Sequence, residues 1–347
     1  MGEPGQANSS VGYFQAIGDP QQRDEREEKY GENMHARLEV SQPQGILAWM
    51  AKSLAIIGPG RVGRALGNRL RENGWRITMV AARSQASAKR GARFIGGGRP
   101  VAGIPVTLAA CSTILITVPD DAIAGVAGEL SRNAGEDLRG RVVLHTSGAL
   151  DACVLEVLRS CGASVGSMHP LQTFSGVSVP PLEGKVFAIE GDEPAVRVAR
   201  RIARSLGGVP VGISADKKPL YHAAGAFAAG LSLAVEEAGV RLLMTAGLKR
   251  REAQRALVSL TRQVLEHYEK LGPQKAWTGP LARGDFGVVA AHEKALREMQ
   301  PEFLEAYVAI SRLAAQELAH EPETMLRELE AISGSVKLVA KAKGGCE

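Results

Sequence analysis

The feature that most constrains this chain is a glycine-rich turn between an apolar strand and a helix. Residues 53–58 read Ser-Leu-Ala-Ile-Ile-Gly, a short run typical of a parallel strand buried on both faces. The motif Gly58-Pro59-Gly60-Arg61-Val62-Gly63 continues from it, and helical periodicity follows as far as Gly74. In this strand-to-helix context, a GxGxxG motif predicts a Rossmann domain that binds a dinucleotide.

Each glycine of the motif has a different expected role. Gly58 permits the tight turn, Gly60 lets the backbone approach the pyrophosphate, and Gly63 allows close helix–strand packing. The free N–H groups at the start of the helix, and its positive end, would face the phosphates. We therefore predict that the whole motif binds the cofactor, including Pro59, Arg61 and Val62.

The end of the second strand indicates which dinucleotide is bound. NAD-specific sites usually place Asp or Glu there, whereas this chain has Arg83 and Ser84. Arg83 can pair with a 2′-phosphate and Ser84 can donate its hydroxyl, so we predict NADP. The alternative is a surface arginine beside a helix cap. Val118 and Pro119, at the end of a later strand, are predicted to line the cofactor, and Asp120 to cap the next helix.

Alternating strand and helix patterns extend from Ser53 to about Ser214, which predicts an α/β fold with a mostly parallel, doubly wound sheet. The strand signal then stops, and amphipathic helices predict an all-α domain. Its first segment, 218–247, is rich in Ala and Gly and predicts one helix packed closely on all sides. The predicted organisation is a loosely attached extension (1–45), a Rossmann domain (51–214), an all-α substrate and dimerisation domain (215–333) and a frayed tail (334–347).

Composition argues against several other classes. The net charge is +5 and aromatic residues make up only 4%, so no stacking platform for nucleic acid is expected. We find no apolar run of the roughly 20 residues that span a bilayer and no signal peptide, so we expect a cytoplasmic protein with no membrane partner. The four cysteines have no metal-ligand spacing and are expected to be reduced thiols, and no metal site is predicted.

Several motifs together resemble a known family. Gly58–Gly63 is followed in order by TVPDDAI, LHTSGAL, SMHPLQTF, LYHAAGAFAAG and GPLARGD. They are similar to two-domain Rossmann-like oxidoreductases whose C-terminal helical domain is of unknown function. By fold these are related to 6-phosphogluconate dehydrogenase, ketopantoate reductase, pyrroline-carboxylate reductase and prephenate dehydrogenase. The resemblance covers about residues 53–333 and implies NADP-linked hydride transfer, a homodimer, and a substrate cleft between the two domains.

The chain departs from this family at one position. Members commonly carry Asn late in the first helix of the second domain, where this chain has Gly230. The missing amide favours an alternative function as a sensor or scaffold that binds NADP(H) without turnover. A deazaflavin electron partner is a further alternative that no residue here requires. Otherwise we expect an oxidoreductase acting on a small, carboxylate-bearing substrate.

Two histidines are candidates for proton transfer near the nicotinamide. His169 ends a predicted strand at the edge where doubly wound folds bind ligands, and Ser147 ends the preceding strand. This pair resembles the Ser and His–Pro loop of prephenate dehydrogenases, although His169 could equally be a turn residue before Pro170. His222, on the first helix of the α domain, is the second candidate, and its alternative is a core histidine.

The charged loop Gly279–Asp285 is a candidate for substrate binding. Arg283 can bind a carboxylate through two hydrogen bonds, or it can form a structural pair with Asp285. His292, two helical turns later, is a weaker candidate.

Overall fold

The computed structural model of the protein describes residues 52–108 and 111–343. The predicted N-terminal extension and Cys346 lie outside the described residues. Contacts divide the chain into two compact units, and the boundary between them crosses the sheet. Of the described residues, 52–108, 111–118, 125–143 and 157–164 form the first unit, and 119–124, 144–156 and 165–343 form the second. Each unit is described by itself below.

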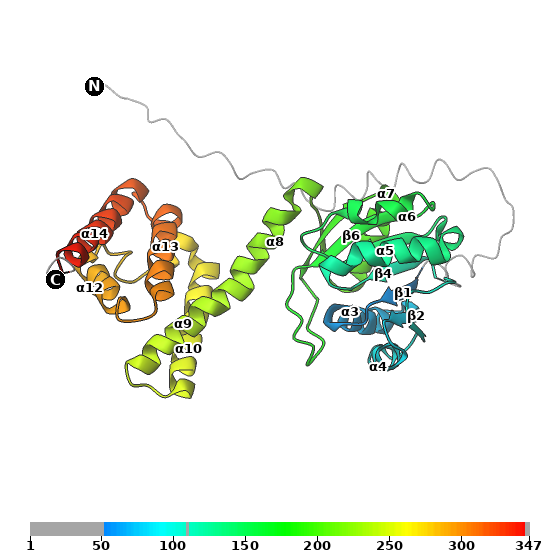
Figure 1. Cartoon of the computed structure of the whole chain (residues 1–347), viewed down its shortest axis with the longest axis horizontal. Helices are drawn as coiled ribbons and strands as arrows, with labels where there is room; N and C mark the ends of the chain where they lie inside the picture. The colour runs from blue at the N-terminus through cyan, green and yellow to red at the C-terminus, as the bar shows by residue number, and fades with distance from the viewer. Residues whose placement is uncertain (1–51, 109–110, 344–347) are drawn as a thin grey trace, which may run out of the picture. The chain divides into compact units, whose positions relative to one another are not determined.

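The strands form one eight-stranded sheet with the order β3-β2-β1-β4-β5-β6-β7-β8 (Figure 1). β1 pairs in parallel with β2 and β4, and β2 with β3, while β6 and β7 are antiparallel. The predicted α/β fold with a mostly parallel sheet is therefore confirmed. The strands are β1 (Ser53–Ile57), β2 (Arg76–Ala82), β3 (Arg99–Ala102), β4 (Thr113–Ile116), β5 (Val142–His145), β6 (Ser164–Pro170), β7 (Val186–Gly191) and β8 (Val209–Gly212).

In the first unit, small residues let α3 (Arg61–Glu72) lie close to the sheet. All five residues of β1 are buried. A Cβ added at Gly67 would lie 2.5 Å from Cδ1 of Ile56, so only glycine allows this approach of helix to strand. The other helix of this region, α4 (Gln85–Ile95), begins at the cap residue Ser84 and ends at Gly96, whose left-handed conformation stops it.

The sequence patterns missed two of these elements. Neither α4 nor β3 was predicted, because each offers only a short apolar signal between polar residues. Residues 150–162 form no continuous helix but contain the 3-10 turn η3 (Ala152–Leu155) and a single α-helical turn, α6 (Glu156–Arg159). The remaining helical elements before β8 are α5 (Asp120–Ala134), η2 (Glu136–Leu138) and α7 (Glu193–Ser205).

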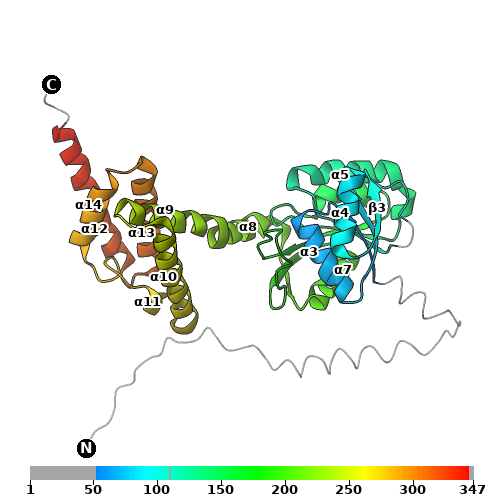
Figure 2. The same cartoon turned by 90° about the horizontal axis from the view of Figure 1, so that it is seen from below.

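All secondary-structure elements described after β8 are helical, as the sequence predicts. In Figure 2, α12, α13 and α14 lie side by side, and they bury Val289, Ala315 and Leu329 in a small core of their own. α14 runs on to Lys343, so it extends into the segment predicted to be frayed. The helical elements are η4 (Ala215–Lys217), α8 (Lys218–Ala226), η5 (Phe227–Leu231), α9 (Ser232–Thr245), α10 (Arg250–Leu271), α11 (Pro273–Ala276), α12 (Phe286–Leu296), α13 (Pro301–Leu318) and α14 (Pro322–Lys343).

The predicted long helix is present but differs in two respects. α8 and α9 are joined by the π-helical turn η5, where the Ser232 hydroxyl donates to the carbonyl of Phe227 at 2.5 Å. π-helical turns of this kind are frequent at functional sites. The helix is also not packed on all sides, since Lys218 is the only buried residue of α8 and Val240 the only one of α9. Its small residues permit close packing, but none of its Ala or Gly residues is buried by the described part of the chain.

Candidate active site

The turn after β1 has the geometry that a dinucleotide site requires. Gly58 has φ +89°, which disfavours other residues, and a Cβ there would lie 2.5 Å from Cγ1 of Val118. At Gly63 a Cβ would lie 2.2 Å from Oγ1 of Thr117, so this glycine too is required for packing. Gly60 is different, because nothing lies closer than 4.0 Å to the position of its Cβ. The turn thus has no space for a side chain at Gly58 and Gly63, whereas the space beside Gly60 is free.

The N-terminus of α3 has no side-chain cap. Gly60 is its N-cap and provides no side chain to bond the first N–H groups, and the first turn contains no acidic residue. Uncapped N–H groups at a helix N-terminus favour an anion such as a phosphate. Arg61 in the same turn is exposed.

At the end of β2 the structure combines both interpretations of the sequence. Arg83 is exposed directly after the strand. Ser84 is the N-cap of α4, where its hydroxyl oxygen accepts a hydrogen bond from the N–H of Ser87 at 3.3 Å. The predicted helix cap is therefore present, and Arg83 lies beside it with its guanidinium accessible to a ligand.

The end of β4 corrects one prediction. The Thr117 hydroxyl donates to the carbonyl of Gly58 at 2.5 Å, which ties the strand end to the glycine turn. Asp120 is not the residue before the following helix but the first residue of α5. Its carboxylate accepts a hydrogen bond of 2.7 Å from the hydroxyl of Ser147.

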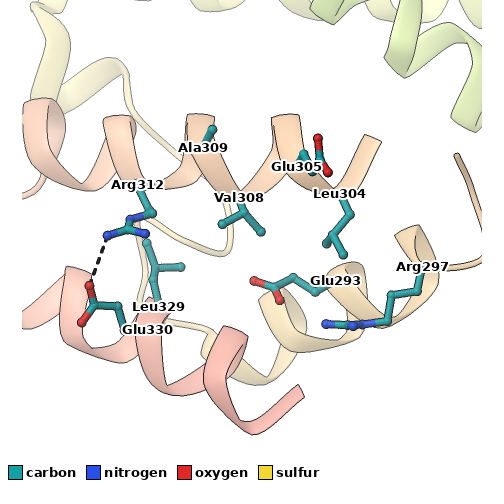
Figure 3. A pocket seen from close by; sticks show the side chains of 9 residues that line it. All are labelled: Glu293, Arg297, Leu304, Glu305, Val308, Ala309, Arg312, Leu329 and Glu330. Carbon is teal, nitrogen blue, oxygen red and sulfur yellow. Dashed lines mark hydrogen bonds and ion pairs between the residues drawn. The ribbon is translucent and has the colours of Figure 1, made fainter. Parts of the chain in front are cut away.

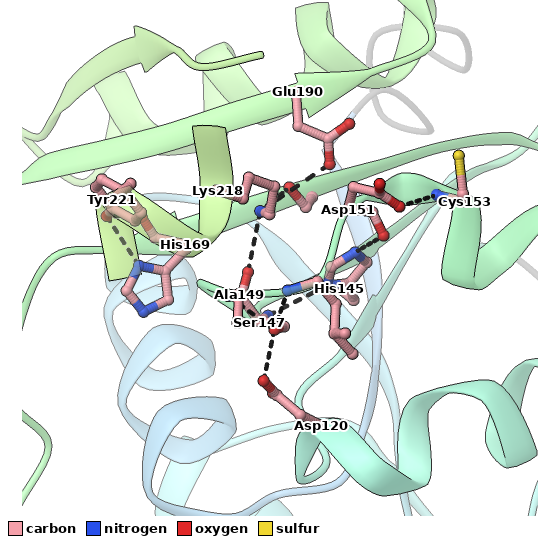
Figure 4. A network of polar contacts seen from close by, with 12 residues as sticks. Asp120, His145, Ser147, Ala149, Asp151, Cys153, His169, Glu190, Lys218 and Tyr221 are labelled. Atoms are coloured by element: carbon pink, nitrogen blue, oxygen red, sulfur yellow. Dashed lines mark hydrogen bonds and ion pairs between the residues drawn. The ribbon is translucent and has the colours of Figure 1, made fainter. Parts of the chain in front are cut away.

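The hydroxyl of Ser147 makes hydrogen bonds that shape the loop after β5. Besides donating to Asp120, its hydroxyl oxygen accepts hydrogen bonds from the N–H groups of Ala149 (3.2 Å) and Leu150 (2.9 Å), as Figure 4 shows in part. A hydroxyl has one proton to donate and two lone pairs, so its capacity is filled. Ser147 is also only 4% exposed. In this structure it builds the 147–150 loop and has no hydrogen bond left for a substrate.

The two candidate histidines lie together against this loop. The rings of His169 and His222 have centroids 5.9 Å apart and are nearly perpendicular. A Cβ on Gly148 would lie 2.7 Å from Cδ2 of His222 and 3.0 Å from Nε2 of His169, so the glycine makes room for both imidazoles. His169 Nδ1 is 2.8 Å from the hydroxyl of Tyr221, which fixes one side of its ring. His222 is exposed in the single chain.

Burial changes the protonation that the sequence led us to expect. The pKa of His169 is lowered to about 4, first by burial and then by the nearby His222 and Lys218. The pKa of His145 is lowered to about 4 as well, mainly by burial. Its Nδ1 accepts from the N–H of Ser147, so its Nε2 carries the proton and donates to the carbonyl of Asp151 at 3.0 Å. An unperturbed histidine has a pKa of about 6.5, so His169 is more completely neutral at physiological pH than an exposed histidine would be.

Sequence reasoning missed Lys218 altogether. Its side chain is 1% exposed, and its ammonium group donates to the Ser167 hydroxyl at 2.7 Å and to the carbonyl of Ser147 at 3.2 Å. Oε1 of Glu190 lies 4.0 Å away (Figure 4). A lysine beside Lys217 at the start of a helix resembles a surface residue, and its partners are distant in sequence.

The loop candidates form local pairs. Arg283 donates from Nε to the Asp285 carboxylate at 2.9 Å, which matches the alternative of a structural pair. Nδ1 of His292 is 3.0 Å from the hydroxyl of Tyr307. Within residues 52–108 and 111–343, no three or more His, Cys, Asp or Glu side chains are placed to hold a metal ion.

A cavity of about 520 Å³ lies among α12, α13 and α14 (Figure 3). It mixes charged and apolar side chains, and Arg312 and Glu330 in its wall form an ion pair of 3.2 Å. None of the site residues predicted from the sequence lines this cavity. It is therefore separate from the histidine cluster.

Two family models match the chain. A Rossmann-like domain covers residues 41–170, and a domain of unknown function, DUF2520, covers residues 185–314. No curated protein sequence matches. Together the two models span the sheet and most of the helical region, which agrees with the resemblance drawn from the motifs.

Solved structures with similar folds include two bacterial proteins and one fungal enzyme. A proposed NADP oxidoreductase from Bacteroides fragilis is 21% identical, with a TM-score of 0.63, and the match covers 76% of this chain and 98% of that one. A protein from Thermotoga maritima is 24% identical (TM-score 0.59; 82% and 99% covered). The reductive aminase from Aspergillus terreus, in complex with NADPH and ethyl-5-oxohexanoate, is 18% identical (TM-score 0.59; 77% and 94% covered). At these identities the likeness establishes the fold, in which a Rossmann-like domain is followed by a DUF2520 domain.

Proposed function

We propose that this protein is an NADP-dependent oxidoreductase that transfers a hydride between the nicotinamide and a small carbonyl or imine substrate. The observation that carries the proposal is the turn at Gly58–Gly63. The chain packs closely around Gly58 and Gly63, but it leaves space beside Gly60, where a pyrophosphate would approach. The solved structures of similar fold with NADPH or NADP in their descriptions support the same cofactor.

The residues present fit this cofactor. The uncapped N-terminus of α3 suits the pyrophosphate, with Pro59, Arg61 and Val62 forming the rest of the turn. Arg83 and Ser84 would hold the 2′-phosphate, since no carboxylate stands at the end of β2 to repel it. Val118 and Pro119 would line the site. When bound, the dinucleotide supplies or accepts the hydride.

His169 is the residue that we propose handles the substrate proton. With a pKa of about 4 its imidazole is neutral at physiological pH, so it suits a base or a neutral hydrogen-bond donor rather than a cationic acid. Its ring is held by Tyr221 and faces Gly148, where His222 also lies. His222 is the second proton-handling residue, and Ser147 supports both through the loop.

The preference for a carboxylate-bearing substrate rests on Arg283. Because Arg283 is paired with Asp285, a substrate carboxylate would have to replace that partner. Both side chains are exposed, and exposed pairs contribute little free energy, so the exchange costs little. A ketone or imine without a carboxylate needs no such exchange.

The alternative function is an NADP(H)-binding sensor without turnover. Gly230 favours it, since a family Asn would extend from η5 and this chain has no side chain there. Nothing lies within 4 Å of the Cβ position of Gly230, so an Asn would fit without a clash. Gly230→Asn is therefore a fair test of whether the amide matters for turnover.

The test of the proposal is oxidation of NADPH with a panel of keto acids, imines and cyclic ketones. We expect turnover with at least one class, and a decrease of about 100-fold or more in His169→Asn, with NADPH affinity changed by no more than a few-fold. Turnover that survives in His169→Asn would remove that residue from the proposal. Cofactor binding without turnover on any substrate would favour the sensor.

We also propose that the protein is a homodimer formed through the helical unit. The helix from Ala215 to Thr245 is 6% buried over its most apolar window, and large apolar side chains are exposed along it. Exposed apolar patches of this kind mark interaction surfaces. A cavity of about 770 Å³, bordered by α9 and the start of α13, extends the same surface. The exposed residues include Leu220, Phe227, Leu231, Leu233 and Val235.

A second copy of the chain suits this surface better than a membrane. By length and composition this one helix among the described residues could cross a bilayer, which is weak evidence by itself. Glu236, Glu237 and Arg241 lie in α9, and charged groups inside a bilayer are costly. We therefore propose a soluble, cytoplasmic homodimer that binds no nucleic acid.

A further inference from the structure

Lys218 lies at a buried position, where a charged ammonium group costs free energy. Its side chain is 1% exposed, and burial lowers the pKa of its ammonium group, while Glu190, Asp151 and Asp120 raise it. Removing a charged group from water costs several kcal/mol unless partners compensate, and an apolar side chain would fill the same space without that cost. The protein therefore retains a buried cation where simple packing does not need one.

The partners of Lys218 join separate segments of the second unit. The ammonium group starts from the first residue of α8, donates to Ser167 in β6, and lies near Glu190 in β7. Its third contact is the carbonyl of Ser147, which opens the loop after β5. Figure 4 shows the Lys218 ammonium group between Glu190 and Ser147. One side chain thus links the start of the helix to two strands and a loop.

The loop contact reaches the histidines through a single residue. Gly148 follows Ser147 directly, and its Cα faces both imidazoles so closely that a Cβ would lie within 3.0 Å of each ring. A shift of a few tenths of an ångström at the Ser147 carbonyl therefore changes the space available to His169 and His222. Tyr221, which holds Nδ1 of His169, is one helical turn beyond Lys218 on α8.

We propose that Lys218 is a positioning residue that fixes the 147–150 loop against the imidazoles of His169 and His222 and does not itself contact the substrate. Both of its resolved hydrogen bonds go to protein groups, and its side chain is closed off from solvent. The inference rests on the proposed role of His169. The measurement that tests it, an NMR titration of the histidine rings, does not depend on enzymatic activity.

The test is an NMR titration of the histidine rings in the full chain without substrate. Lys218→Met removes the charge and the hydrogen bonds of the ammonium group but keeps a side chain of similar length. The matched control is Lys217→Met, since Lys217 is exposed and forms an ion pair with its neighbour Asp216 at 3.2 Å. The groups that act electrostatically on His169 are His222, Lys218, Asp120 and His145. The charge of Lys218 lowers the pKa of His169, so removing this ammonium group raises it.

We expect the pKa of His169 to rise from about 4 by about 0.5 or more in Lys218→Met, together with a shift of the Gly148 amide resonance. Lys217→Met changes neither. Lys218→Arg, which keeps the charge and the donors, restores part of the wild-type titration. If Lys218→Met does not fold, Ser167→Ala removes one partner of the ammonium group but keeps its charge. We expect that variant to shift the Gly148 amide resonance.

An unchanged His169 titration in folded Lys218→Met, or an unchanged Gly148 amide resonance in Lys218→Met or Ser167→Ala, would overturn the inference. A protein that never oxidises NADPH would instead contradict the proposed function and leave the titration result standing. The two failures are therefore distinguishable.

Discussion

The hydroxyl of Ser147 donates a 2.7 Å hydrogen bond to the carboxylate of Asp120, the first residue of α5. The same oxygen accepts hydrogen bonds from the N–H groups of Ala149 and Leu150. One side chain therefore holds the turn after β5 and attaches it to the start of a helix. Because Gly148 lies inside that turn, the arrangement of the two histidines depends on this hydroxyl.

Replacing Ser147 by Ala should destabilise the protein. The two backbone N–H groups and the Asp120 carboxylate each lose a partner, and a hydrogen bond to a charged group contributes about 1.5–3 kcal/mol. We expect the free energy of unfolding, measured in urea, to fall by about 2 kcal/mol. Ser178→Ala, at an exposed position, is the control and should change it very little. Equal effects of the two variants would show that the hydroxyl does not hold the turn.

Stability should decrease as the pH falls from about 6.5 toward 4. His145 and His169 have folded pKa values of about 4, below the 6.5 of an unfolded histidine, so the unfolded chain binds protons first over this range. Their contribution is complete above pH 6.5 and is lost as the pH falls through about 4. Urea denaturation at several pH values measures it.

His145→Gln should make this pH dependence shallower, provided that the variant folds. The exposed His320 gives the control, and His320→Gln should leave the slope unchanged. A stability that stays constant between pH 7 and pH 4.5 in the wild type would contradict the lowered pKa values.

Two glycines of the turn should respond differently to the same substitution. At Gly60 an alanine has open space, so the melting temperature should be nearly unchanged, but the added methyl group should obstruct the pyrophosphate and weaken NADPH binding about 10-fold or more. At Gly63 the methyl group would collide with Thr117, so the melting temperature itself should fall. The pattern is checked by thermal unfolding beside a fluorescence titration. Unchanged NADPH affinity in a folded Gly60→Ala would place the cofactor elsewhere.

A single charge on the exposed helix should separate the subunits of the proposed dimer. Leu233, which is 69% exposed, would be buried on assembly, so Leu233→Asp should give a monomer by light scattering after gel filtration. Val177 is 89% exposed outside this helix, and Val177→Asp should stay dimeric. A monomeric wild type would refute the dimer.

Much of the fold follows from sequence because the periodic signals are local. β2 occupies the predicted residues, and α3 ends within two residues of Gly74, where the glycine and the polar residues before it stop the helix. The cofactor turn was equally accessible, since Gly58, Gly60 and Gly63 act on their immediate neighbours. Short-range geometry of this kind leaves a clear pattern in the sequence.

The polar network could not be read from the sequence in the same way. The bonds of Lys218 reach back 51 residues to Ser167 and 71 to Ser147, and no local pattern indicates that this lysine is buried. Ser147 was identified as important, but its role depends on Asp120, which lies 27 residues before it. The exposed helix was misjudged for a related reason, because Ala and Gly predict close packing without saying which chain provides the neighbour.

A fluorescence titration of the purified protein with NADPH and NADH tests most directly whether the glycine turn at Gly58–Gly63 binds NADP(H) in preference to NAD(H). We predict saturable binding of NADPH that is about 10- to 100-fold tighter than that of NADH, because Arg83 pairs with the 2′-phosphate. Arg83→Ala should remove most of the difference, whereas Arg132→Ala, at an exposed position on α5, should preserve it. Equal affinities for the two cofactors in the wild type, or no binding of either, would contradict the account.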